Sequence, residues 1–455
     1  MAQLRAGAAE LDITPWLGIA IAGYFIPRKA EDIHDPLRAK ALVLDDGRTR
    51  LAMVVLDLLG LGRADVQAIR AQVAEATDIA ADCVMVTCTH THTGPAVRQP
   101  GEPEREDAYV QWMIRRAADA VRIAELRLQP ARLATGRGEL HGVCFCRRWR
   151  MRDGSVRMNP EPGDPDIVEP TSPVDPTVGL LYVEDSAGQP LAVLAQYGLH
   201  FVGTDNGRHI SADYFGHFAD AIRRILGPAC QPMLMNGTSG QVNNLNPLNP
   251  NRLRGHQQGK RVAAALAAEV VRIIATITPT AEATLASATE HIALPRKRVT
   301  ADDVELAEKI IAQSETNPME GRFSYVVGQP IPANLVVERY AKGCRKLYEL
   351  DGQPIEAEVQ AFRIGDSGWV ALPGEIFVEI GLAIKDQSPL SQTFVIGLAN
   401  DYLGYIPTDH ALQHEGGYET WATPRNAVGV GAETILCRAA DRVLAQVTAP
   451  TSATA

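Results

Sequence analysis

Apolar runs of strand length alternate with stretches of helical periodicity along the chain. Residues Leu51–Asp57 and Cys83–His90 are almost continuously apolar, which is typical of strands buried on both faces. Between them, Ala64–Ala76 carries an apolar residue at every third or fourth position, the rhythm of a helix. A strand, a helix and a second strand within about 40 residues predict a βαβ unit with a parallel strand pair.

The same alternation continues through the rest of the chain. The acidic residues Glu104, Glu106 and Asp107 open a predicted helix that runs through Leu126, because negative charge stabilises a helix N-terminus. The segment Asn159–Pro176 is dense in proline and aspartate and predicts a loop or lid. Later strands are predicted at Val178–Val183, Leu191–Leu199, Pro232–Met235, Val359–Ile364, Trp369–Leu372 and Phe394–Leu398, and later helices at Tyr214–Leu226, Gly255–Ile277, Ala301–Gln313, Ile376–Lys385 and Gly431–Val447.

These elements predict a mixed α/β fold with largely parallel sheets and flanking helices. No repeat and no linker divides the 455 residues into self-contained halves. We therefore expect a single domain at residues 1–449, followed by a disordered tail at residues 450–455.

Charge and hydropathy exclude several classes of function. Lys and Arg number 44 and Asp and Glu number 54, which leaves a formal net charge of −10. Such a surface repels phosphate backbones and anionic lipids on balance, so the expected partner is a small molecule and not a nucleic acid. We expect no membrane span, because charged residues interrupt each apolar stretch before the roughly 20 residues that a spanning helix needs.

The seven cysteines are odd in number and scattered, which predicts reduced thiols and not a disulfide framework. The first residues lack the basic start and apolar core of an export signal. We therefore expect a cytoplasmic protein. Its oligomeric state is open, and a homo-oligomer is compatible with the sequence because symmetric dimers are common.

The strongest chemical signal is the segment Thr89–Pro95, which reads THTHTGP and follows a buried strand. Side chains two positions apart lie on the same side of an extended chain, so His90 and His92 converge. Ligands of open parallel sheets bind beyond the carboxyl ends of the strands, where this pair is expected. We favour a metal site over a hydrogen-bonded histidine pair that only closes the strand.

Other predicted strands also end in residues that bind metals. His200 ends a strand, although a lone histidine there is as often structural. Glu375 follows one later strand, and another ends in Asn400, Asp401, Tyr402 and Tyr405. The two histidines His90 and His200, the glutamate and a tyrosine would supply two nitrogens and two oxygens, a set suited to zinc with room for water. Asp213 stands before a helix, and its default role is that of an N-cap.

The segment Asn236–Asn246 contains two glycines and many amide side chains, which suit a turn that approaches a ligand closely. Ser239 does not lie in a Gly-x-Ser-x-Gly elbow, so a serine hydrolase is not supported. No glycine-rich phosphate loop occurs in the chain.

Taken in this order, the segments resemble the neutral (non-lysosomal) ceramidase family, in particular the catalytic domain and shorter bacterial-type members. The resemblance covers nearly the whole chain. It is carried by Ala6–Gly23, Thr89–Pro95, Asn236–Asn246, Leu372–Glu375 and Asn400–Tyr405, and by Tyr418.

The resemblance implies one zinc ion, Zn²⁺, bound by four residues: His90, His200, Glu375 and Tyr405. In that family a zinc-activated water attacks an amide carbonyl, and the tyrosine and a neighbouring histidine stabilise the oxyanion. Tyr405 and His92 are thus the expected catalytic residues, with His92 as a hydrogen-bond donor or acid. Substrate contact is expected from Asn236, Asn243, Arg148 and Tyr402.

One departure bears on the substrate: Asn243 stands where ceramidases carry a serine, and an amide is neither a nucleophile nor a proton shuttle. We therefore expect hydrolysis of the C–N amide bond of a small polar N-acyl compound. Arg148 is expected to pair with an acidic or hydroxylated group of it, while Arg150 and Arg152 lie on a solvated face.

Two alternatives stay open. The first is a metal-dependent lyase, isomerase or ester or lactone hydrolase that acts on a sugar-like molecule, because an asparagine-rich loop holds hydroxyl groups well. The second is a non-catalytic binding protein of the same fold, which four intact ligand positions disfavour.

Overall fold

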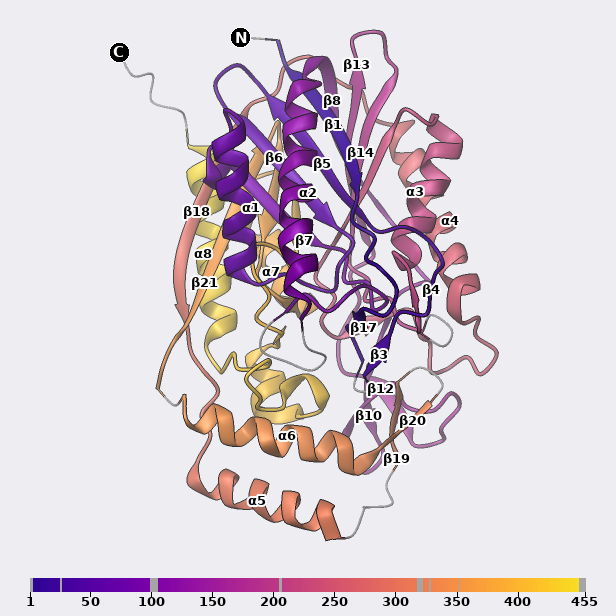
Figure 1. Cartoon of the computed structure of the whole chain (residues 1–455), viewed down its shortest axis with the longest axis vertical. Helices are drawn as coiled ribbons and strands as arrows, with labels where there is room; N and C mark the ends of the chain where they lie inside the picture. The colour runs from indigo at the N-terminus through magenta and orange to yellow at the C-terminus, as the bar shows by residue number, and fades with distance from the viewer. Residues whose placement is uncertain are drawn as a thin grey trace.

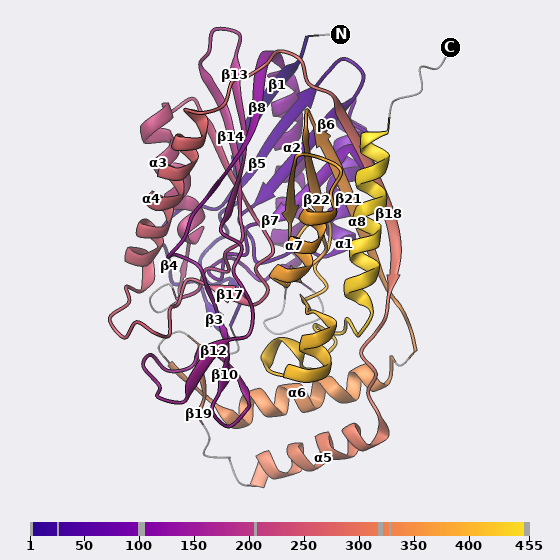
Figure 2. The same cartoon turned by 180° about the vertical axis from the view of Figure 1, so that it is seen from behind.

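The computed structural model describes residues 3–24, 27–98, 105–203, 207–316, 322–326, 329–350 and 352–449. The predicted tail at residues 450–455 lies outside the described residues. Two sheets pack face to face, and helices cover the outer face of each, so the main body has four layers (Figures 1 and 2).

The larger sheet has eight strands, in which only the pairs β14–β16 and β6–β7 are parallel. All other neighbours in it are antiparallel, so the prediction of largely parallel sheets is wrong, although the mixed α/β class is confirmed. In spatial order the strands are β16 (Gln231–Asn236), β14 (Pro190–Tyr197), β13 (Thr177–Asp185), β8 (Gln129–Glu139), β1 (Arg5–Asp12), β5 (Arg38–Asp45), β6 (Arg50–Leu56) and β7 (Val84–Cys88).

The smaller sheet packs on the inner face of the larger one. Leu42 and Met53 face Trp369 and Phe394 across this interface, and all four side chains are buried. Of its pairs only β22–β24 is parallel. The strands are, in spatial order, β18 (Leu285–Leu294), β21 (Ile355–Ile364), β22 (Ser367–Ala371) and β24 (Gln392–Ile396).

Amphipathic helices close both outer faces. In α2 the buried residues recur every three or four positions, as at Tyr109, Met113 and Ala117, and they pack on alternate residues of β5 and β6. The outer face of the larger sheet carries α1 (Arg63–Ala76), α2 (Asp107–Leu126), α3 (Asp213–Leu226) and α4 (Gly255–Ile274), and that of the smaller sheet carries α7 (Val378–Gln387) and α8 (Ala432–Thr448).

Shorter elements surround the end of the molecule at which β7, β14, β16 and β24 finish. The predicted loop Asn159–Pro176 contains β12, which pairs with β10, so part of it is a strand. The pair of helices α5 (Ala301–Thr316) and α6 (Ala333–Tyr348) lies at the end of the molecule away from both termini (Figures 1 and 2). The short strands are β2 (Ala20–Ile21), β3 (Arg28–Lys29), β4 (Asp32–Ile33), β9 (Phe145–Cys146), β10 (Arg148–Met151), β11 (Val156–Met158), β12 (Ile167–Pro170), β15 (His209–Ile210), β17 (Val242–Asn243), β19 (Arg322–Val326), β20 (Gln329–Pro332), β23 (Glu375–Ile376) and β25 (Tyr405–Ile406).

The edge strands β7 and β16 of the larger sheet approach each other at their carboxyl ends. Asn236, at the end of β16, accepts a hydrogen bond from the Leu199 amide (3.1 Å) and donates to the Thr89 carbonyl (3.4 Å). The Thr87 hydroxyl donates to the Gly397 carbonyl (3.1 Å), which ties in the end of β24. The ends of β7, β14, β16 and β24 therefore meet in one place.

No helix among the described residues is long and apolar enough to span a bilayer.

Candidate metal centre

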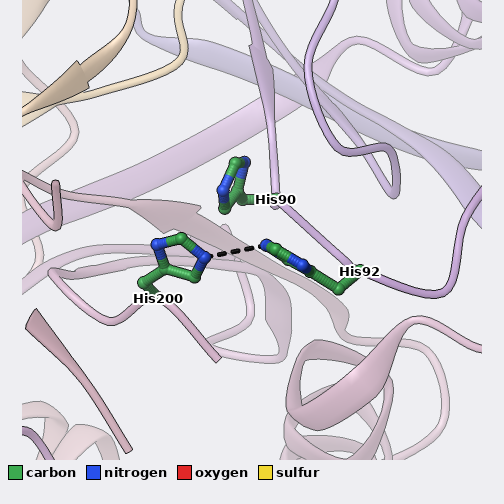
Figure 3. Close-up of side chains that lie close together, drawn as sticks. All are labelled: His90, His92 and His200. Carbon is green, nitrogen blue, oxygen red and sulfur yellow. Dashed lines mark hydrogen bonds between the residues drawn. The ribbon is translucent and has the colours of Figure 1, made fainter. Parts of the chain in front are cut away.

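Three imidazoles meet where the strand ends converge. His90 and His92 follow β7, and His200 follows β14. Figure 3 shows the three rings close together. The ring centroid of His90 lies 4.9 Å from that of His92 and 4.5 Å from that of His200. One nitrogen from each of the three lies within 4.8 Å of the other two, and all three side chains are buried. The predicted convergence of these histidines is confirmed.

The convergence has a different cause from the one that the sequence suggested. His90 does not sit on an extended chain, because its φ is 72°, in the left-handed region. Its amide donates to the Leu58 carbonyl (2.9 Å), and its Nδ1 donates to the Leu59 carbonyl (2.6 Å). A proton held on Nδ1 leaves the lone pair of Nε2 directed into the site, which is how metal-binding histidines are usually oriented.

Glu375 brings a carboxylate to the same point. Its Oε2 lies 3.4 Å from His90 Nε2 and 3.5 Å from His200 Nδ1, and its Oε1 accepts a hydrogen bond from the Tyr402 hydroxyl. Burial by itself would raise the pKa of Glu375, but His90 and Arg147 outweigh it and the pKa is lowered. The carboxylate is therefore ionised at neutral pH.

Three buried atoms of this set make no hydrogen bond: His90 Nε2, His92 Nδ1 and Glu375 Oε2. The first and the last of these face each other at 3.4 Å. Buried polar atoms are nearly always partnered, so a facing pair of this kind indicates a ligand between them. Two imidazoles and one carboxylate are ligands that zinc prefers. The residues present thus fit the divalent ion that the sequence predicted.

His200 is held from both sides of its ring. Its Nε2 faces His92 Nε2 at 2.7 Å (dashed line in Figure 3), and its Nδ1 faces Arg147 Nη1 at 3.0 Å. Burial lowers the pKa of both His92 and His200 well below the ordinary value, and the nearby His90 and Arg147 lower both further. Both rings are neutral at neutral pH, the form in which imidazole binds metals.

Asp213 fixes the segment that carries the two histidines. Its carboxylate accepts hydrogen bonds from the hydroxyls of Thr91 (2.8 Å) and Thr93 (2.9 Å) and from the His92 amide (3.1 Å). The predicted role of Asp213 as an N-cap is wrong, since Ala212 occupies the cap position and no side chain caps α3. The carboxylate instead holds the loop after β7 in place.

The predicted substrate residues Asn236 and Asn243 are fully buried and bonded to the protein. Asn236 ties the strand ends together, as described above. Asn243 donates to the side-chain oxygen of Asn159 (2.8 Å) and accepts from the Leu245 amide (2.9 Å). In this structure both amides act as supports of the loop that the sequence marked as a ligand contact.

Arg148 is also used within the protein. Its guanidinium donates to Glu419 (2.7 Å), to Glu415 (3.0 Å) and to the Gly416 carbonyl (2.8 Å), and its side chain is buried. The expected pairing of Arg148 with a substrate is therefore not what the structure shows. Arg150 and Arg152 are exposed, as predicted.

The two tyrosines at the end of the smaller sheet differ in their contacts. Tyr402 bonds to Glu375, and the Arg98 guanidinium lies 3.7 Å from its ring centroid. Tyr405 is the strand partner of Glu375 in the β23–β25 pair, and the Arg147 guanidinium lies 5.1 Å from its ring centroid. Burial raises the pKa of both hydroxyls well above the ordinary value, so both stay protonated. The role of Tyr405 as a fourth ligand stays a prediction.

Sequence reasoning missed three residues that position the site: Asp213, Arg147 and Glu419. Arg147 donates from Nε to Glu419 (2.7 Å) while it faces His200. Neighbouring residues of an extended chain point to opposite sides, but this alternation does not tell which of Arg147 and Arg148 faces the strand ends.

Part of the chain is similar in sequence to known proteins. The family model for the N-terminal part of neutral/alkaline non-lysosomal ceramidases matches residues 4–224, which include His90, His92 and His200. The curated neutral ceramidase of Pseudomonas aeruginosa is 27% identical over 230 residues, which are 47% of this chain and 32% of that protein. The match thus spans about a third of the curated relative.

Solved structures extend the likeness in fold to the rest of the chain. A crystal structure of neutral ceramidase from Pseudomonas aeruginosa matches with a TM-score of 0.73 at 18% identity, over 98% of this chain and 75% of that one. A structure described as ceramidase complexed with C2 matches with a TM-score of 0.72 at 17% identity, over the same shares. Residues 4–224 of this chain are thus similar in sequence to the N-terminal part of neutral ceramidases, and nearly the whole chain shares their fold.

Proposed function

We propose that the protein is a zinc-dependent hydrolase that cleaves the amide bond of an N-acyl compound. The observation that carries the proposal is the facing pair of buried atoms, His90 Nε2 and Glu375 Oε2, with His200 beside it. The relatives carry the name neutral ceramidase, and ceramide is itself an N-acyl amide. An amide hydrolase therefore accounts for both the site and the family.

His90, His200 and Glu375 would hold the ion, with Tyr405 as the expected fourth ligand. A bound zinc ion supplies Lewis acidity for the amide carbonyl and lowers the pKa of water to about 7. The carboxylate of Glu375 offsets the charge of the ion in a buried site. The Tyr402 hydroxyl keeps that carboxylate oriented, because it occupies Oε1 and leaves Oε2 for the ion.

The remaining residues of the site act on the substrate. His92 contributes a neutral imidazole next to His200, positioned to donate a hydrogen bond to the carbonyl oxygen, or to take the proton that the attacking water loses and pass it to the leaving amine. The hydroxyl of Tyr405 stays protonated and serves as a second donor to the developing oxyanion. Arg147 holds His200 and adds positive charge at the same side of the site.

We infer a small polar N-acyl substrate and not bulk ceramide. Asn243 replaces the serine of the family motif, and its amide is bound to Asn159. The position therefore cannot supply a nucleophile or a proton shuttle. The alternative of a reaction on a sugar-like molecule loses its support, because Asn236 and Asn243 bond the protein itself.

The test is hydrolysis of a panel of N-acyl amines by the purified chain, with a short-chain ceramide as one member. We expect chelation to abolish turnover, zinc to restore it, and short polar members to exceed the ceramide in kcat/KM. His141→Ala is the control, since His141 is exposed and pairs with Glu139. Full activity after exhaustive removal of metal contradicts the proposal, and a higher kcat/KM for the ceramide contradicts the polar substrate.

A further inference from the structure

A second group of histidines lies outside the metal centre. We call it the surface histidine cluster, and its members are His34, Asp35, His209, His217 and His256. Four of the 11 histidines of the chain are thus gathered in one place. They come from four elements that are distant in sequence: the segment after β4, β15, α3 and α4.

The rings of the cluster meet through their nitrogens. His256 Nε2 faces His209 Nε2 at 2.9 Å, and His256 Nδ1 faces His217 Nε2 at 3.3 Å. The ring of His34 is stacked on that of His256, with centroids 3.5 Å apart and planes 4° apart. A carboxylate joins them, because His34 Nδ1 lies 2.7 Å from an oxygen of Asp35.

We propose that the surface histidine cluster is a second metal-binding site for a divalent transition ion such as zinc. One ligand atom each of His34, Asp35 and His256 lies within 4.8 Å of the other two. Bonds of about 2.0–2.2 Å to a tetrahedral ion place ligand atoms roughly 3.5 Å apart. Side-chain rotations that move the ligand atoms by about an ångström bring these three atoms into range for one ion. His209 and His217 supply further nitrogens.

The chemistry and the access of the cluster both suit such an ion. Imidazole with one carboxylate selects zinc, nickel or copper over calcium and magnesium, which prefer oxygen ligands. The side chain of His34 is 36% exposed and that of Asp35 is 20% exposed, while His256 is buried. An ion can therefore enter from solvent and reach a buried ligand without opening of the fold.

The surface histidine cluster is connected to the loop that carries the first site. Asp35 accepts hydrogen bonds from the Ser211 hydroxyl and from the Ala212 amide (2.7 Å). The Ser211 carbonyl in turn accepts from the hydroxyls of Thr91 (2.7 Å) and Thr93 (2.9 Å). An ion on Asp35 would therefore brace the start of α3 against the segment that holds His90 and His92. The second site does not depend on the proposed function.

Equilibrium dialysis of the chelator-treated chain against zinc tests the proposal, with bound zinc counted per chain. We expect two equivalents for the wild type, one for His34→Ala/His217→Ala and one for His90→Gln/His200→Gln. The control His141→Ala retains both. An unchanged count in His34→Ala/His217→Ala overturns the proposal. A wild type that binds one equivalent and loses it in His90→Gln/His200→Gln overturns it as well.

A second measurement separates a lost ligand from a lost fold. Cobalt(II) bound to His90→Gln/His200→Gln should give visible d–d absorption, and zinc should raise the melting temperature of this variant. If circular dichroism shows that His34→Ala/His217→Ala is unfolded, the single variant His34→Gln replaces it, because the His34 side chain is partly exposed. We expect the second equivalent to bind at least about tenfold more weakly to it. Unchanged affinity contradicts the site.

Discussion

The metal centre and the surface histidine cluster are both built from histidine and carboxylate side chains, but they differ in burial and in hydrogen bonding. At the metal centre the rings are buried, and His90 Nε2 and Glu375 Oε2 face each other without a hydrogen bond. In the surface histidine cluster the rings are partly exposed, and the nitrogens of His256 face those of its neighbours. Burial with unpartnered atoms costs free energy, and such a cost persists where a ligand or a reaction requires it.

The difference extends to the residues around each site. Asp213, Arg147 and Tyr402 hold the loop, a histidine and the carboxylate of the metal centre, each from a different element. Asp35 supplies a carboxylate to the surface histidine cluster. We conclude that the first site is preorganised for chemistry, whereas an ion at the second site would brace the fold.

The largest expected effect follows from Glu375→Gln, which keeps the volume and removes the charge. We expect kcat to fall by about 10³-fold or more, because a catalytic metal supplies several kcal/mol of transition-state stabilisation. Turnover of the best N-acyl substrate and zinc content measure it. Glu356→Gln, at an exposed position of β21, is the matched control. A Glu375→Gln enzyme within tenfold of wild type would remove the metal centre from the mechanism.

Arg147→Met and Arg148→Met form a matched pair, because both guanidiniums bind Glu419 but only Arg147 reaches His200. We expect kcat to fall about 10–100-fold in Arg147→Met, the usual cost of losing a partner of a metal ligand. In Arg148→Met, KM and kcat stay near wild type.

Urea unfolding of the same two variants reports the shared loss of a buried ion pair. Both should lose about 3–5 kcal/mol of unfolding free energy, since Glu419 keeps a buried charge with one partner fewer. Equal losses of kcat in the two variants would show that stability, and not the contact with His200, sets the rate.

Asp213→Asn should lower kcat about tenfold and weaken zinc binding at the metal centre. An amide cannot accept all three hydrogen bonds that the carboxylate takes from Thr91, Thr93 and the His92 amide. Asp220→Asn, on the exposed face of the same helix, is the control. Wild-type zinc affinity and kcat in Asp213→Asn would mean that the loop keeps its shape without this residue.

The smallest expected effect is on the pH dependence of the unfolding free energy. It comes from Lys297, a buried cation outside both groups of histidines. Burial lowers the pKa of Lys297 to about 7, and its ammonium donates to the Trp421 carbonyl (3.3 Å). Between that pH and the unfolded value of about 10.4 only the unfolded chain holds the proton, so unfolding free energy rises with pH.

The contribution of Lys297 to the slope of unfolding free energy against pH is at most about 1.4 kcal/mol per pH unit. Lys297→Met should flatten it and stabilise the chain at pH 7, as urea unfolding at several pH values would show. The exposed Lys260→Met is the control and should keep the slope. A wild-type slope in Lys297→Met would show that this lysine is solvated.

The sequence predicted the elements with strong periodicity and missed those that depend on neighbours. The helix Asp107–Leu126 ends at the predicted residue, because an acidic start and a regular apolar stripe define it locally. The strands β1, β5 and β8 were not predicted. In β1, Arg5–Asp12 is rich in Ala and Gly, and pairing with β5 and β8 makes it a strand. These three strands take part in four of the five antiparallel pairs of the larger sheet.

In the candidate site, too, residues marked by a local pattern were predicted and residues placed by distant neighbours were not. His90, His200 and Glu375 were predictable because each ends an apolar run, and strand ends gather in one place. Asp213 and Arg147 were not, because their partners lie 53 to 272 residues away along the chain. Which buried charge meets which partner is decided by the sheet order, and no local pattern records it.

The most direct test of the central claim is a crystal structure of the zinc-loaded chain with anomalous data at the zinc edge. We predict a peak between His90, His200 and Glu375, with bonds of about 2.0–2.2 Å to His90 Nε2 and Glu375 Oε2. The absence of a peak there, in crystals grown from fully active protein, would contradict the account.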